Sequence, residues 1–199
     1  MTVPPFAVLH VCMGNICRSP MAERLLVAAT IELAGDGATE LVYSNSAGTG
    51  GWHQGEPMNP PAARQVRSRG GTDVGFTANK LRADHIDAAD LILTATIEQV
   101  DYVVALRPDA ADRTFVLGEF GRLLHTVDLS TLPPASRQPD AVYARGVALV
   151  AAVDAARDGR PAGPEDEIDD PWGRGDGYFE RVADDIHAVV QPLATALLT

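Results

Sequence analysis

Short apolar segments alternate with helix-forming segments along this 199-residue chain, and this alternation is the feature that most constrains its fold. Helical patterns follow the first two apolar runs, beginning near Ser19 and Asn59. Parallel strands need long crossover connections, which are usually helices. The sequence therefore predicts an α/β fold with an open parallel four-stranded sheet and helices on both faces. The four expected strands lie at residues 6–11, 41–44, 90–94 and 113–117.

The first and last predicted helices have clear signals. Ser19 is of a type that caps helix N-termini, Pro20 suits the first helical position, and Gly35 is expected to end the first helix. A last helix is predicted over residues 178–198. Residues 118–163 contain a leucine-rich segment, a proline-rich loop and an Ala/Val helix, which we interpret as an inserted helical lid or brace.

Length and composition bound the kind of protein. A chain of 199 residues with 46% hydrophobic content can bury one full core, so we expect a single domain over residues 1–199. The net charge of −11 argues against binding to nucleic acid or to an anionic membrane, so any anion site must be built locally. No apolar run approaches the roughly 20 residues that span a bilayer, and the N-terminus lacks a basic signal region. A cytoplasmic location is expected.

Both cysteines of the chain, Cys12 and Cys17, lie in the loop after the first predicted strand. In a reducing compartment such a pair is more often catalytic, redox-active or metal-binding than structural. The five histidines are scattered and no second Cys/His pair exists, which disfavours zinc. We expect no metal and no cofactor, and we interpret the pair as reactive thiols.

This cysteine loop, residues 12–18, combines a nucleophile with an anion site. Cysteine attacks as the thiolate, whose formation is favoured near a helix N-terminus and a cation. Cys12 has both neighbours, because a helix follows and Arg18 offers a bidentate guanidinium. The N–H groups of residues 13–18 can turn inward as a nest for an anion. The loop is therefore predicted to bind a tetrahedral oxyanion over the Cys12 sulfur.

Three further residues fit this chemistry. Gly14 allows the backbone to approach a ligand closely, and Asn15 can hold an unusual dihedral angle. The Ser19 hydroxyl can donate a hydrogen bond to the Cys12 sulfur. A thiolate beneath a bound phosphate is aligned for in-line displacement, so positioning and electrostatics supply most of the catalysis. The product of the attack would be a phosphocysteine.

The loop resembles the signature of the low-molecular-weight protein tyrosine phosphatases, which is a cysteine, five residues, an arginine and a serine or threonine after the first strand. The resemblance implies the flavodoxin-like phosphotyrosine phosphatase I fold, with Cys12 as nucleophile and Arg18 as phosphate clamp. It covers residues 6–117 and 166–198, but not the segment between them. The matching loop residues, expected to bind substrate or support the thiolate, are Met13, Gly14, Asn15, Ile16, Cys17 and Ser19.

The same resemblance implies roles for residues outside the loop. Asp170 directly precedes a proline, as the family's general acid does, and would protonate the leaving group and later activate water. Asp169 is its rival. Ser46 would brace the cysteine loop, and Trp52 and Trp172 would form two aromatic walls suited to a phenyl phosphate. The resemblance also implies that Cys17 is dispensable for turnover but can trap oxidised Cys12 as a reversible disulfide.

The resemblance favours a cysteine-dependent phosphatase that acts on phosphotyrosine in proteins or on small aryl phosphates, with inorganic phosphate as product. Ile16 supports this, because family members that resemble arginine-phosphate phosphatases usually have threonine there. One alternative is an arsenate reductase that uses an external thiol, since no cysteine follows Cys17. Another is a phosphate-binding module without turnover. The sequence indicates no oligomeric state.

Overall fold

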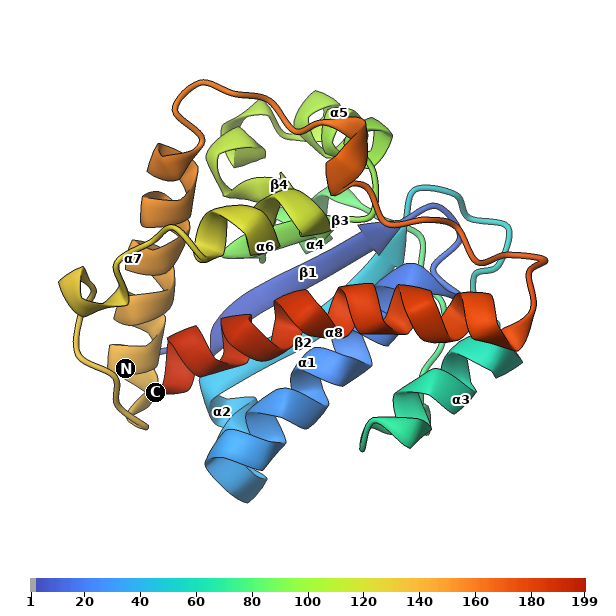
Figure 1. Ribbon diagram of the computed structural model, residues 1–199, viewed down its shortest axis with the longest axis horizontal. Coiled ribbons are helices and arrows are strands. Elements are labelled where there is room, and N and C mark those ends of the chain that lie inside the picture. The colour runs from blue at the N-terminus through green and yellow to red at the C-terminus, as the bar shows by residue number, and fades with distance from the viewer. Residues whose placement is uncertain (1–2) are drawn as a thin grey trace.

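A single parallel sheet forms the centre of the molecule in the computed structural model, which describes residues 3–199 (Figure 1). The strand order is β2-β1-β3-β4, which confirms the predicted open four-stranded α/β architecture. The order reverses between β1 and β3, so a crevice is expected at the carboxyl ends of these strands. The strands are β1 Phe6–Cys12, β2 Val42–Gly48, β3 Leu91–Thr94 and β4 Thr114–Val116.

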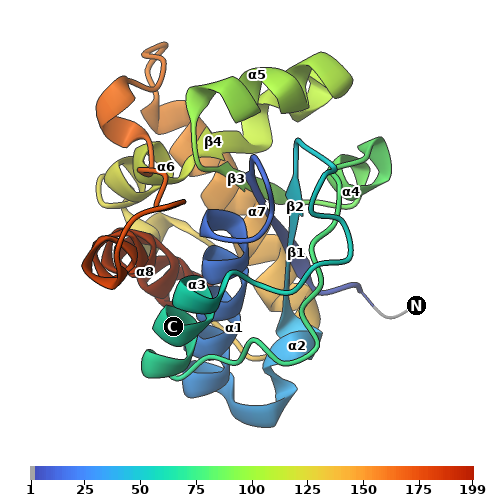
Figure 2. The ribbon, with the colours of Figure 1, turned by 90° about the vertical axis from the view of Figure 1, so that its right-hand side faces the viewer.

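Helices cover both faces of the sheet. Figure 2 shows α1, α6 and α8 on one side and α4 and α5 on the other. Side chains of β1 alternate between two hydrophobic clusters, with Phe6 and Val8 in the larger and Leu9 and Val11 in the smaller. None of the helices within residues 3–199 is long and apolar enough to cross a membrane. The helices are α1 Arg18–Ala34, α2 Ala38–Leu41, α3 Pro60–Ser68, α4 Ala83–Asp87, α5 Ile97–Leu106, α6 Leu117–Leu124, α7 Pro139–Ala156 and α8 Asp176–Leu198.

The start of α1 differs from the prediction. The helix begins at Arg18, with Cys17 in the N-cap position, so Ser19 lies in the first turn and does not cap the helix. The serine hydroxyl is instead hydrogen-bonded to the Cys12 sulfur, and this contact sets the orientation of the Ser19 side chain. The predicted end of the helix is confirmed, because Gly35 follows its last residue with φ of 70°.

The segment 118–163 forms part of the core and does not cover the crevice. Gly146 of α7 lies against Phe6 of β1, where a Cβ would be 2.4 Å from the phenylalanine ring. A Cβ on Gly121 of α6 would likewise lie 2.6 Å from the Val189 side chain of α8. The lid interpretation is therefore wrong, because the apolar face of α7 is buried against β1, α6 and α8; the brace interpretation holds. The predicted buried face of α7 is confirmed at Val142, Gly146, Leu149, Val150 and Val153.

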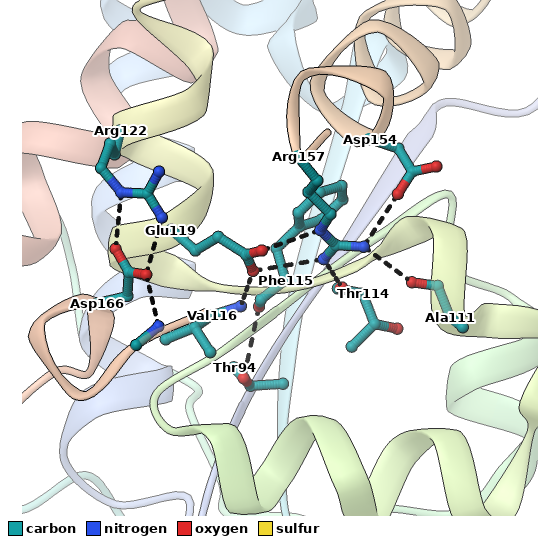
Figure 3. A network of polar contacts seen from close by, with 11 residues as sticks. Thr94, Ala111, Thr114, Phe115, Val116, Glu119, Arg122, Asp154, Arg157 and Asp166 are labelled. Carbon is teal, nitrogen blue, oxygen red and sulfur yellow. Dashed lines mark hydrogen bonds and ion pairs between the residues drawn. The ribbon is translucent and has the colours of Figure 1, made fainter. Parts of the chain in front are cut away.

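A polar network centred on Arg157 joins the end of α7 to β4 and α6 (Figure 3). The guanidinium lies 3.9 Å from the centre of the Phe115 ring, and its Nε donates to Glu119 Oε1 at 2.9 Å. It also donates to the backbone carbonyls of Thr114 and Ala111. Only 3% of the Glu119 side chain is exposed, so Arg157 compensates a buried negative charge.

His10 is a buried polar residue on β1 for which the sequence suggested no role. Neither ring nitrogen has a hydrogen-bond partner among residues 3–199. Burial lowers the pKa of His10 to about 3, so the imidazole is neutral at physiological pH. The ring borders a small cavity that Arg18 and Ser19 also line, which places it in the core directly behind the cysteine loop.

Replacing Arg157 by leucine would leave the buried Glu119 carboxylate without its cation. We expect the free energy of unfolding, measured by urea denaturation, to fall by about 3 kcal/mol. The control is Arg82→Leu, which breaks an exposed ion pair with Asp84 and should leave the stability close to that of the wild type. Equal stability of the two variants would contradict this account of the network.

Candidate active site

A cleft of about 260 Å³ opens at the carboxyl end of β1. Three segments that are far apart in the sequence meet there: the cysteine loop, the loop after β2 and the segment before α8. All the predicted substrate-contacting residues except Asn15 and Ser19 line it, and those two lie behind the loop. The lining residues are Cys12, Met13, Gly14, Ile16, Cys17, Arg18, Trp52, His53, Asp170 and Trp172.

Cys12, the last residue of β1, is placed at the start of the loop with its sulfur hydrogen-bonded to Ser19. The Cys12 Sγ and Ser19 Oγ atoms are 3.0 Å apart. Ser19 Oγ also accepts a hydrogen bond from Asn15 Nδ2 at 2.9 Å, which leaves the serine proton free for the sulfur. This is the contact that the sequence predicted, and it holds the sulfur in place at the start of the loop.

Asn15 fixes the shape of the loop. It adopts a φ of 54°, a left-handed conformation that asparagine tolerates better than most residues. Its Nδ2 also donates to Ser46 Oγ at 2.8 Å, and its Oδ1 accepts from the Asn79 backbone N–H at 2.7 Å. Ser46 in turn donates to Glu23 Oε2 at 2.6 Å. The predicted bracing contact of Ser46 is therefore present.

Glu23 is a supporting residue that the sequence did not reveal. Its carboxylate accepts the Ser46 hydrogen bond from within the first turns of α1, and burial raises the pKa of Glu23. From sequence alone, a glutamate near the start of a helix is expected to be exposed to solvent. The packing of α1 against β2 brings the carboxylate within reach of Ser46.

The end of β2 approaches the cysteine loop so closely that only glycine fits. A Cβ on Gly48 would lie 2.7 Å from the carbonyl oxygen of Met13. The next two backbone N–H groups, of Thr49 and Gly50, donate to the carbonyls of Cys12 and Met13 at 2.9 Å. These bonds turn the loop carbonyls outward.

Within residues 3–199, the backbone N–H groups of residues 14–17 donate no hydrogen bond to another protein group. These N–H groups follow Cys12 directly and precede the N-terminus of α1. Consecutive free N–H groups at a helix N-terminus form a binding site for an anion. The arrangement suits a phosphate-sized oxyanion next to the sulfur.

Arg18 connects the cysteine loop to the distant segment before α8. Its Nη1 donates to the Ile168 carbonyl at 3.0 Å and its Nη2 to Asp170 Oδ2 at 2.9 Å. The arginine side chain is only 7% exposed, whereas that of Asp170 is 48% exposed. Both groups line the cleft, so the candidate clamp and the candidate acid face the same space.

The choice between the two neighbouring aspartates has a geometric basis. Asp169 Oδ2 accepts hydrogen bonds from Tyr178 Oη and Arg181 Nη2, each at 2.9 Å, and this carboxylate does not line the cleft. Asp170 lines the cleft and contacts Arg18. Only Asp170 can reach a group bound over Cys12.

Aromatic side chains form the rim of the cleft. Trp52 and Trp172 are both more than half exposed, and His53 lies between them, with ring centroids 6.2 Å and 5.8 Å away. His53 Nδ1 is 2.7 Å from Glu56 Oε2, which orients the imidazole. The sequence indicated no role for His53; its position next to Trp52 in a glycine-rich loop was the available signal.

Cys17 lies in the same cleft as Cys12 but in a different environment. Burial, and secondly the neighbouring Cys12, raise the pKa of Cys17 to about 12, so it stays a thiol at neutral pH. Both cysteines are free in the structure. The trapping of oxidised Cys12 by Cys17 stays a prediction. No group of three or more potential metal-ligating side chains occurs within residues 3–199.

Comparisons with known proteins agree with this geometry. A profile of the family described as low molecular weight phosphotyrosine protein phosphatase matches residues 7–152. A low molecular weight protein-tyrosine-phosphatase of Streptomyces coelicolor is 34% identical over 138 residues, 69% of this chain and 79% of the relative. A protein-arginine-phosphatase of Geobacillus stearothermophilus is 34% identical over 116 residues, 58% of this chain and 72% of the relative.

The similarity extends to solved structures. The YwlE arginine phosphatase from Geobacillus stearothermophilus superimposes with a TM-score of 0.64 and 25% sequence identity, over 96% of this chain and 92% of that protein. The family profile continues through α6 and most of α7, so the predicted exclusion of residues 118–163 from the resemblance is wrong up to residue 152. The profile ends before Asp170, whose assignment depends on geometry.

The two cysteines should react differently with iodoacetamide at pH 7. Because a thiolate is alkylated and a thiol is not, we expect mass spectrometry to find the adduct on Cys12 and none on Cys17. Inorganic phosphate should slow the reaction by filling the loop. In the Cys12→Ala variant the labelling should disappear. Labelling of Cys17 at a rate similar to that of Cys12 would contradict the assigned environments.

Proposed function

The chain belongs to the low molecular weight phosphotyrosine protein phosphatase family, and from this premise we propose that it hydrolyses aryl phosphate monoesters, phosphotyrosine in proteins among them. The observation that carries this proposal is the contact between Arg18 and Asp170, 152 residues apart, beside the sulfur of Cys12. A nucleophile, a cation and a carboxylate thereby face one cleft. The reaction needs no cofactor.

In the first step the phosphate is bound by the N–H groups of residues 14–17 and by Arg18. The Cys12 thiolate attacks phosphorus in line with the leaving oxygen, so the S–P bond forms as the P–O bond to the phenol breaks. The bound dianion competes with Asp170 for the guanidinium. Asp170 acts as the general acid and donates a proton to the leaving oxygen.

In the second step the phosphocysteine is hydrolysed. Asp170, now a carboxylate, takes a proton from a water molecule that attacks phosphorus opposite the sulfur. The P–S bond breaks, inorganic phosphate leaves, and the Cys12 thiolate is restored with its hydrogen bond from Ser19. The same carboxylate serves first as acid and then as base, because the leaving phenol oxygen and the attacking water oxygen occupy the same position opposite the sulfur.

The shape of the rim supports an aromatic substrate. The exposed faces of Trp52 and Trp172 lie on the cleft, and Ile16 adds an apolar surface at its base. These side chains would pack against a phenyl ring. The protein-arginine-phosphatase relative supports a second candidate, a phosphoarginine side chain, which would place a planar cation between the same rings.

Substitution of the proposed nucleophile and acid tests the mechanism. Cys12→Ser should abolish hydrolysis of phenyl phosphate, and Asp170→Asn should lower kcat by about 10²-fold. Asp169→Asn is the matched control and should retain most of the activity, since its carboxylate faces Tyr178 and Arg181. Full activity of Cys12→Ser would refute the mechanism. A larger loss in Asp169→Asn than in Asp170→Asn would reverse the assignment of the acid.

Substrate preference can be measured on matched peptides that carry phosphotyrosine or phosphoarginine at the same position. We expect a higher kcat/KM for the phosphotyrosine peptide, and Trp52→Ala should lower it through KM. A preference for phosphoarginine would select the second candidate. Arsenite production from arsenate with an external thiol, without phosphate release from either peptide, would identify a reductase instead.

A further inference from the structure

Asp166 is a buried carboxylate outside the cleft, four residues before Asp170. Its side chain is 3% exposed and accepts hydrogen bonds from Arg122 Nε at 3.1 Å, Arg122 Nη2 at 2.9 Å and the Gly163 backbone N–H at 3.0 Å. Figure 3 shows this pair at one end of the polar network. The Arg122 guanidinium holds the pKa of Asp166 below its usual range. The pair is thus a fixed ionic contact between α6 and the segment before Asp170.

Close backbone packing also holds Asp166 against α6. Asp166 ends a short 3-10 turn, Pro164–Asp166, which lies directly on the first turn of α6. A Cβ on Gly118 would be 2.4 Å from the Asp166 carbonyl oxygen, so no other residue fits there without moving the turn. Neither the ion pair nor this contact involves any residue that lines the cleft.

From Asp166 the chain runs to Asp170 through an ordered series of bonds. Glu167 Oε1 accepts from the Ile97 N–H at 2.9 Å, and the Ile168 N–H donates to the Ala95 carbonyl at 2.8 Å. These bonds hold the segment across the end of β3. The next contacts, at Ile168 O and Asp170 Oδ2, are both made with Arg18.

The proposed reaction makes the contacts with Arg18 conditional, because bound phosphate competes for the same guanidinium. Asp170 is half exposed, and within residues 3–199 its other oxygen accepts a hydrogen bond only from the nearby Trp172 N–H. During proton transfer the position of the Asp170 carboxyl group therefore depends on the part of the segment before α8 that makes no contact with Arg18 and is not disturbed by bound phosphate. That part begins at Asp166.

We propose that Arg122 and Asp166 are positioning residues that hold Asp170 within reach of the leaving oxygen. The inference rests on the proposed function of Asp170 as the general acid. It also gives the segment after β4 a role, since α6 carries Arg122 and Gly118. The pair acts through the backbone and touches neither substrate nor sulfur.

Leaving-group dependence separates positioning from general stability. Phenolate needs a proton in order to leave, whereas dinitrophenolate leaves without one. Because kcat/KM reports steps up to formation of the phosphocysteine, Arg122→Gln and Asp166→Asn should lower kcat/KM for phenyl phosphate by about tenfold, part of the full effect of a general acid. For dinitrophenyl phosphate the change should be less than about twofold. Arg122→Lys should recover part of the loss.

The matched control is Arg107→Gln, which breaks another bidentate ion pair, with Asp87, remote from the cleft. It should leave both substrates unaffected. Arg157→Leu controls for lost stability, because it weakens the same network without touching Asp166. All variants are assayed well below their melting temperatures, and Arg122→Gln replaces a half-exposed side chain and serves if Asp166→Asn does not fold.

The outcomes distinguish this inference from the proposed function. Loss of activity that is equal for the two substrates, or no loss in Arg122→Gln, would overturn the positioning role. If Asp170→Asn still shows the selective loss with phenyl phosphate, the proposed function stands even then. If Asp170→Asn shows no selectivity, Asp170 is not the acid and the inference fails with that assignment, whereas only full activity of Cys12→Ser would overturn the proposed hydrolysis itself.

Discussion

The side-chain amide of Asn15 is the group on which the candidate site depends. Its two N–H bonds reach Ser19 and Ser46, and its oxygen accepts from the backbone of Asn79. One side chain thereby ties the cysteine loop to α1, to β2 and to the segment that follows α3. These bonds maintain the left-handed backbone at Asn15, in the loop whose N–H groups at residues 14–17 have no protein partner within residues 3–199. The position of the Cys12 sulfur and the anion site both depend on this one loop conformation.

Arg18 is the second constraint, because it joins the local half of the site to its distant half. It is nearly buried, yet it has a carbonyl and a carboxylate partner on the segment before α8. A chain with a net charge of −11 repels anions at long range, so a phosphate must be attracted by groups at contact distance. Free N–H groups and one guanidinium provide this attraction without changing the overall charge.

The features that the sequence predicted well are local ones. Strand, loop and helix follow from apolar periodicity over a few residues, and Cys12, Arg18 and Ser19 are close neighbours in the chain. Asp170, far along the chain, was indicated only by the family resemblance, in which the general acid directly precedes a proline. Tertiary contacts decided the rest. The apolar face of α7 became part of the core, and Glu23 and Asp166 acquired partners that no spacing along the chain indicates.

The central claim is that the Cys12 sulfur forms a covalent bond to phosphorus. Rapid acid quenching of the Asp170→Asn variant during turnover of dinitrophenyl phosphate, followed by tandem mass spectrometry, tests this most directly. The first step needs no proton with this substrate, whereas the second step is weakened, so the intermediate accumulates. The account predicts a phosphorylated peptide with the phosphate on Cys12. Phosphate on Cys17 or on another residue, or turnover without any phosphorylated protein, would contradict it.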